Sequence, residues 1–63
     1  MPWTEVRYPP AMRHLAPDAR AKAIEIANAL LSEGYDEGRA IRIAIARAKE
    51  WARRRGLPME SAA

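Results

Sequence analysis

Two amphipathic stretches of the sequence are separated by the short segment Gly34-Tyr35-Asp36, and this spacing constrains the fold more than any other feature. Apolar residues recur every three or four positions on both sides of the segment, which is the pattern of helices with one buried face. A glycine directly after a helix favours a left-handed C-cap, and an aspartate directly before one favours an N-cap. Since the connection is so short, the two helices are expected to be close neighbours, antiparallel or steeply crossed.

Both expected helices have identifiable ends. Pro17 suits the start of a helix over residues 18–33, because a proline at the first helical position loses no helical hydrogen bond. A helix over about residues 37–55 begins after Asp36 and ends at Gly56. The apolar arc of the first helix consists of Ala19, Ala23, Ile24, Ile26, Ala27, Leu30 and Leu31. Its polar arc, on the opposite side, consists of Lys22, Glu25, Asn28, Ser32 and Glu33. The apolar arc of the second helix consists of Ile41, Ala44, Ile45, Ala48, Trp51 and Ala52.

The residues before the first long helix are expected to cover the remaining apolar surface. Residues 1–9 are expected to form an extended arm, and Pro10 to open a short helix that ends near Leu15. We therefore predict an all-α fold: a single helical domain over residues 1–56, with the arm and the short helix packed on a two-helix hairpin, and a disordered tail over residues 57–63. The residues expected to pack on the hairpin are Trp3, Tyr8, Met12 and Leu15.

A chain of 63 residues buries only about 60% of its unfolded surface, so its core is marginal. Small domains often depend on disulfides, a metal or a partner for additional stability. The sequence has no cysteine and a single histidine, His14, which argues against disulfides and against a metal site built from these residues. Self-association and close packing of alanine-rich helices remain as sources of additional stability. Neither a signal peptide nor a membrane span is expected, so we expect a cytoplasmic protein.

No catalytic, cofactor-binding, metal or small-molecule site is expected. The stretch around Gly34 and Gly38 could cradle a phosphate or bind calcium, but its acids would repel a phosphate and it is too short for a calcium loop. His14 has no nucleophile near it in the sequence and is expected at the surface or at a cap. Trp3 and Trp51 are expected in the core rather than stacked on a ligand, because the chain has no phenylalanine.

Charge is distributed unevenly along the sequence. Residues 18–38 carry a net charge of −3 and residues 39–56 a net charge of +6, within a total of +3. Three uses of the resulting basic helix remain open: a nucleic-acid contact, a contact with an acidic protein partner, and a solvated face. The solvated face would be partly neutralised by the preceding acidic helix and by a pair between Glu50 and Arg54 at i, i+4. Ile43 lies among the cations, either beneath the N-terminal arm or inside a protein interface. The candidate interaction face consists of Arg39, Arg42, Ile43, Arg47, Lys49 and Arg53.

A basic helix after a short turn is superficially similar to the recognition helix of a helix-turn-helix protein. Recognition helices usually contact DNA with their N-terminal residues, however, and here that end carries Asp36 and Glu37. We therefore favour a non-enzymatic helical protein-interaction module, which acts through a protein partner or as a homodimer. The alternative is a nucleic-acid-binding protein that uses Arg39, Arg42, Lys49 and Arg53.

Three segments of the sequence carry a resemblance to a known family. They are "MPW", "YPPAMRHL" and "KAIEIANALLSEGYDEGRAIRIAIARAKEWA", within residues 1–56. The chain resembles the YdaT-like family of small bacterial proteins, in which this segment often precedes a second small domain of unknown function; that domain is not expected here, since the sequence stops soon after Pro58. The resemblance implies no activity and no catalytic or binding residue. The opening from Pro9 to Pro17 is also similar to that of ChaB-like proteins, described as regulators of cation transport.

Overall fold

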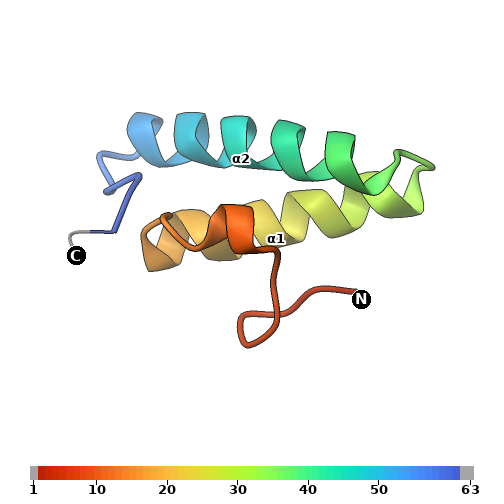
Figure 1. Cartoon of the computed structure of the whole chain (residues 1–63). Coiled ribbons are helices and arrows are strands. Elements are labelled where there is room, and N and C mark those ends of the chain that lie inside the picture. The colour runs from red at the N-terminus through yellow and green to blue at the C-terminus, as the bar shows by residue number, and fades with distance from the viewer. Residues whose placement is uncertain (1, 62–63) are drawn as a thin grey trace.

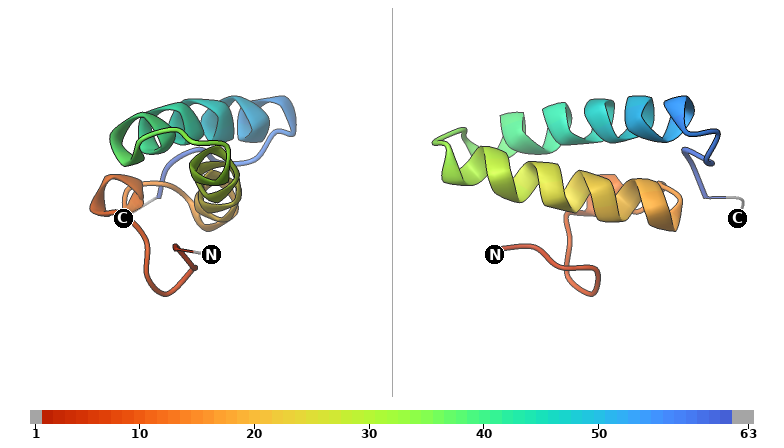
Figure 2. Two further views of the ribbon diagram at one scale, coloured as in Figure 1. Left: turned by 90° about the vertical axis from the view of Figure 1, so that its right-hand side faces the viewer. Right: turned by 180° about the vertical axis from the view of Figure 1, so that it is seen from behind.

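The structure, a computed structural model, describes residues 2–61, which form one short turn of 3-10 helix and two α-helices (Figure 1). The 3-10 turn η1 spans Pro10–Met12, α1 spans Pro17–Ser32 and α2 spans Glu37–Arg54. α1 and α2 lie side by side and antiparallel, and they provide the main contact between elements (Figures 1 and 2). The predicted all-α class and the helical hairpin are therefore confirmed.

The centre of the hairpin is a row of alanines rather than larger apolar residues. The row repeats at every fourth position of each helix, so all its members lie on one face. Because alanine side chains are small, they fit between closely spaced helices, and Ile41, Ile45 and Trp51 lie at the flanks, only partly buried. Ala40, which the predicted apolar arc omitted, belongs to the row. The alanine seam, whose members all have 0% exposure, consists of Ala19, Ala23, Ala27, Ala40, Ala44, Ala48 and Ala52.

The connection between the helices has the caps that its sequence predicted. Gly34 has a φ of +101°, in the region that favours glycine. Its N–H donates to the Leu31 carbonyl (3.0 Å), and the Tyr35 N–H donates to the Leu30 carbonyl (3.1 Å), which is the Schellman pattern of a helix end. The Asp36 carboxylate then accepts the N–H of the third residue of α2 (3.2 Å). The predicted turn is confirmed.

α1 is also covered on the side that faces away from α2. The arm runs beside α1 on that side, and η1 packs next to it (Figure 2). Met12 and Leu15 are fully buried, as predicted, although the short helix is only the single turn Pro10–Met12. Tyr8 packs partly buried against the core, as expected of an arm residue.

Asn28 lies in this second interface of α1, although the sequence placed it on the polar arc. Its side chain is only 5% exposed. Its amide group hydrogen-bonds both the N–H and the carbonyl of Trp3, as a neighbouring backbone segment would do. Asn28 Oδ1 accepts the Trp3 N–H (3.2 Å), and Asn28 Nδ2 donates to the Trp3 carbonyl (3.0 Å). The prediction was wrong because this partner lies far away in the sequence, where helical periodicity gives no information.

The segment after α2 turns back across the open end of the hairpin. We expected residues 57–63 to form a disordered tail, but the described part, residues 57–61, makes specific contacts. The Ala16 N–H donates to the Met59 carbonyl (3.1 Å), and the Ser61 N–H donates to the His14 carbonyl (2.7 Å). Leu57 packs partly buried against the core. Residues 62–63 lie outside the described residues.

Candidate functional site

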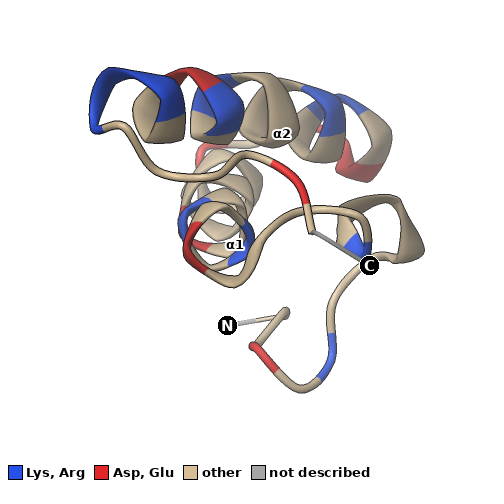
Figure 3. Cartoon of the chain, turned by 90° about the vertical axis from the view of Figure 1, so that its left-hand side faces the viewer, with Lys and Arg blue, Asp and Glu red and all other residues tan. Residues whose placement is uncertain are grey.

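The predicted interaction face lies along α2, which carries six basic and two acidic side chains. Figure 3 shows that α2 holds most of the lysine and arginine positions of the chain. Helical spacing divides the face into two edges: Arg39, Ile43 and Arg47 follow one another at intervals of four residues, and so do Lys49 and Arg53 on the other edge. The two edges differ in their electrostatic partners.

Three arginines of this face carry uncompensated charge: Arg39 and Arg47 on the first edge, and Arg42, which helical spacing places beside Lys49 and Arg53 on the second edge. Arg39, Arg42 and Arg47 are exposed, and none of them forms an ion pair within residues 2–61. The Arg39 guanidinium lies over the Tyr35 ring, 5.3 Å from its centroid, which fixes it near the hairpin turn. This part of the face can therefore accept a carboxylate or a phosphate from another molecule without first breaking an ion pair.

Lys49 and Arg53 on the second edge, in contrast, are paired with acids of the same chain. Lys49 Nζ lies 3.4 Å from a carboxylate oxygen of Glu60, and Arg53 Nη2 lies 2.7 Å from one of Glu50. Arg54 Nε bonds to the same carboxylate at 3.0 Å, so the predicted pair at i, i+4 is confirmed. The hydrogen bonds from Arg53 and then Arg54 lower the pKa of Glu50 from its ordinary value of 4.5 to about 2.

Ile43 is partly buried on α2 and does not lie under the N-terminal arm. The arm follows the side of α1 that faces away from α2 in each of the views, so it does not reach the α2 surface (Figures 1 and 2). The apolar part of Ile43 that solvent reaches lies between Arg39 and Arg47 in the helical register. It can thus add an apolar contact to the uncompensated edge.

Trp51 is surrounded by cations in a way that the sequence analysis missed. The Lys22 ammonium from α1 lies 5.2 Å from the Trp51 ring centroid, and the Arg55 guanidinium lies 4.9 Å from it. The spacing of Trp51 and Arg55 at i, i+4 could have predicted the second contact, whereas the first one requires knowledge of how the helices pack. Trp51 is partly buried against the core, as predicted for a core aromatic, and its ring is already engaged by these cations.

The remaining candidates hold no constellation of reactive groups. His14 is exposed, as predicted, and its backbone carbonyl accepts the Ser61 N–H. Within residues 2–61, no group of three His, Cys, Asp or Glu side chains is placed to hold a metal ion. Neither α1 nor α2, the two long helices of this part of the chain, combines the length and the hydropathy needed to cross a membrane.

Comparison with known proteins gives one informative relative. No family model matches the chain, and no solved structure matches it. The chain is 56% identical over 52 residues to an uncharacterized protein, YdaT of Bacillus subtilis (strain 168). The match covers 82% of this chain and 35% of the relative, so the chain spans about a third of that protein's length. The resemblance predicted from the sequence is confirmed: the chain belongs to the YdaT-like family.

Proposed function

We propose that this chain is a non-enzymatic helical module that binds an acidic surface of another protein through the basic face of α2. The observation that carries the proposal is the set of exposed arginines Arg39, Arg42 and Arg47, which have no ion pair within the described residues. Guanidinium groups bind carboxylates through two parallel hydrogen bonds, so an acidic partner would supply the counter-charges. Ile43 would add an apolar contact near the centre, as in many protein interfaces.

The rigid support beneath this face favours binding over simple solvation. α2 is held against α1 by the alanine seam, and it is capped at both ends, by Asp36 at its start and by Gly56 after its end. The arginines are therefore displayed on a fixed helix, and only their side chains lose freedom on binding.

The proposal is tested with two double variants that make the same change of charge at two places on the molecule. Arg42→Glu with Arg47→Glu alters the α2 face, and Lys22→Glu with Arg55→Glu, beside Trp51, alters neither that face nor the N-terminal arm. A partner is isolated from a bacterial lysate with the tagged chain, and its affinity is then measured by calorimetry. We expect the α2 variant to bind at least about tenfold more weakly and the control to bind normally. Equal binding by the α2 variant would refute the proposal.

Self-association is measured in the same series, because a second copy of the chain is one partner that a small domain can use. Sedimentation equilibrium of the wild type gives the oligomeric state. If a dimer forms through the α2 face, Ile43→Glu weakens it while the circular dichroism of the monomer stays unchanged. A variant that unfolds would show that Ile43 belongs to the core.

A nucleic-acid contact is the second candidate, and the density of cations on α2 favours it. Against it stand Asp36, which is occupied as the N-cap of α2, and Glu37, at the end that recognition helices usually bring to DNA. Amide NMR spectra with duplex DNA separate the two candidates. Local shifts over residues 39–53 that persist at physiological salt would establish DNA binding, whereas a diffuse response that salt abolishes would exclude it.

A further inference from the structure

The N-terminal arm contains a fixed turn that exposes an apolar side chain. The Thr4 N–H donates to the Arg7 carbonyl (2.8 Å), and the Arg7 N–H donates back to the Thr4 carbonyl (3.2 Å). Thr4 Oγ1 also accepts the N–H groups of Val6 (3.3 Å) and Arg7 (3.1 Å). The turn holds Val6 at its tip, where the residue is 94% exposed. The turn therefore fixes an apolar side chain in solvent, where it contributes little to the packing of the fold and where another molecule can contact it.

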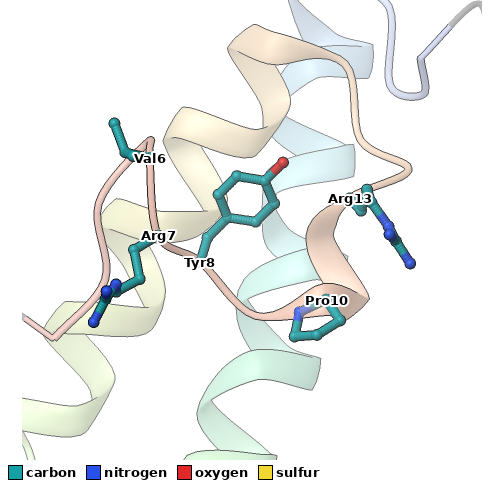
Figure 4. A pocket seen from close by; sticks show the side chains of 5 residues that line it. All are labelled: Val6, Arg7, Tyr8, Pro10 and Arg13. Carbon is teal, nitrogen blue, oxygen red and sulfur yellow. The ribbon is translucent and has the colours of Figure 1, made fainter.

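Val6 is one wall of an open concavity that is distinct from the α2 face. The concavity has a volume of about 360 Å³ and is lined by Val6, Arg7, Tyr8, Pro10 and Arg13. Figure 4 shows the Tyr8 ring in the middle, with Val6 and Arg7 on one side and Pro10 and Arg13 on the other. Its floor is thus aromatic and apolar, and its rim is basic. We call it the arm pocket.

The floor of the arm pocket is held in place from behind. Arg20 of α1 donates from Nη1 to the Tyr8 hydroxyl (3.2 Å) and from Nη2 to the Leu15 carbonyl (2.8 Å). The Arg20 guanidinium also lies over the Tyr8 ring, 4.9 Å from its centroid. Because Tyr8 is fixed before binding, a ligand that contacts it loses little free energy to ordering of this side chain.

The rim of the arm pocket carries positive charge without an internal counter-charge. Arg7 and Arg13 are exposed, neither forms an ion pair among the described residues, and no acid lines the pocket. Glu5, at the neighbouring position of the turn, is not part of the lining. Tyrosine and arginine around an apolar centre are also the residue types that contribute most to protein interfaces.

We propose that the arm pocket docks a short acidic segment of a protein partner, with an apolar side chain of that segment between Val6 and Tyr8 and its carboxylates on Arg7 and Arg13. The apolar centre favours a peptide over a phosphate backbone, which has no side chain to place against the exposed valine. Arg20 already lies over the Tyr8 ring and restricts stacking of a base on that side. The pocket is independent of the α2 face, so either surface can bind without the other.

The test is an NMR titration of the full chain with three probes. The first is a capped hexapeptide that alternates glutamate and leucine, the second replaces its glutamates by lysine, and the third is a short oligothymidylate. We expect the acidic peptide alone to shift the amide signals of Val6, Arg7, Tyr8 and Arg13. Equal or larger shifts of these signals with the oligothymidylate would overturn the proposal in favour of a nucleic acid. The absence of local shifts with millimolar acidic peptide would overturn it altogether.

Variants separate a shaped pocket from general attraction between charges. Arg7→Ala with Arg13→Ala is expected to weaken binding of the acidic peptide by about tenfold or more. Val6→Ser is expected to weaken it without a change in thermal stability, because Val6 makes so little contact in the fold. The matched control, Lys22→Ala with Arg55→Ala, removes the same charge beside Trp51, away from both surfaces, and is expected to leave the affinity within about twofold. An equal loss in this control would overturn the proposal without affecting the test of α2 with its own partner.

Discussion

α1 and α2 differ in how much of their surface the rest of the chain covers. α1 lies between α2 on one side and the arm and η1 on the other, and even the polar Asn28 on its far side is almost completely buried. α2 packs against α1 through the alanine seam, while Arg42, Ala46 and Arg47 on its outer face are exposed. This difference shows that α1 is the central helix of the domain, packed on two sides, whereas α2 is packed on one side and has a face free for contacts.

The strongest test of this comparison places the same substitution on the two faces of α2. Ala48→Leu inserts a larger side chain into the alanine seam, where residue 48 has 0% exposure, and should lower the free energy of unfolding by about 2–3 kcal/mol. Ala46→Leu on the exposed face should change it by less than about 0.5 kcal/mol. Urea denaturation followed by circular dichroism measures both. Equal losses would contradict the distinction between a packed and a free face.

The next test removes the second interface of α1. Asn28→Ala leaves the N–H and carbonyl of Trp3 without their partner, and should cost about 1–2 kcal/mol. Because the arm is the part released, hydrogen exchange of the Trp3 amide should become much faster, while amides in the alanine seam change less. Ser32→Ala is the control, since Ser32 bonds only to the nearby Ala29 carbonyl at the surface. Unchanged protection of Trp3 in Asn28→Ala would show that other contacts hold the arm.

A pair of glycine substitutions distinguishes the end of α1 from the start of α2. Gly34→Ala forces a side chain into a conformation with φ of +101° and should cost about 1–2 kcal/mol. Gly38→Ala should instead stabilise the chain by about 0.5 kcal/mol, because Gly38 lies within a helix and an added Cβ would meet its nearest neighbours at an ordinary 3.5 Å. Thermal denaturation of both variants tests the opposite signs, and a loss in Gly38→Ala would contradict this account of the α2 start.

The smallest expected effect concerns the exposed ion pairs of α2. The pKa of Glu50 is lowered to about 2 by Arg53 and Arg54 in the folded chain, whereas the ordinary value is 4.5. The contribution of these pairs is therefore fully present above pH 4.5, and it is lost as the pH falls toward 2. NMR titration of the Glu50 carboxyl should give the lowered pKa, and Arg53→Ala with Arg54→Ala should raise it. A wild-type value near 4.5 would mean that solvent disrupts the pairs.

The ends of the helices could be predicted because each cap is encoded within a few neighbouring residues. Gly34 and Gly56 follow the last apolar positions of their helices, and Asp36 precedes the next helix, so local geometry alone determines their roles. The centre of the hairpin was less predictable. Periodicity identifies a buried arc but not how closely two helices approach, and that distance is what puts Ala40 and Ala44 between the helices and Ile41 at the flank.

In the candidate site, too, the features encoded within one helix were predictable, and those that depend on packing between distant segments were not. Spacing along α2 identified its cations and the pair between Glu50 and Arg54, because both ends of the pair lie on one helix. The ion pair between Lys49 and Glu60 needs the return of the C-terminal segment, which no local pattern encodes. The exposure of Val6 likewise depends on the hydrogen bonds of its turn and on the position of the arm beside α1.

The backbone pairing of residues 14–16 with residues 59–61 also has a consequence for the order of folding. It joins segments that lie 43 to 47 residues apart in the sequence, so its formation closes a large loop and carries a high entropic cost until the hairpin has formed. The caps around Gly34, in contrast, join residues a few positions apart and can form early. We therefore expect the pairing to form after the hairpin and to open before it, and we expect hydrogen exchange of the Ala16 amide to report partial opening that leaves the two helices together.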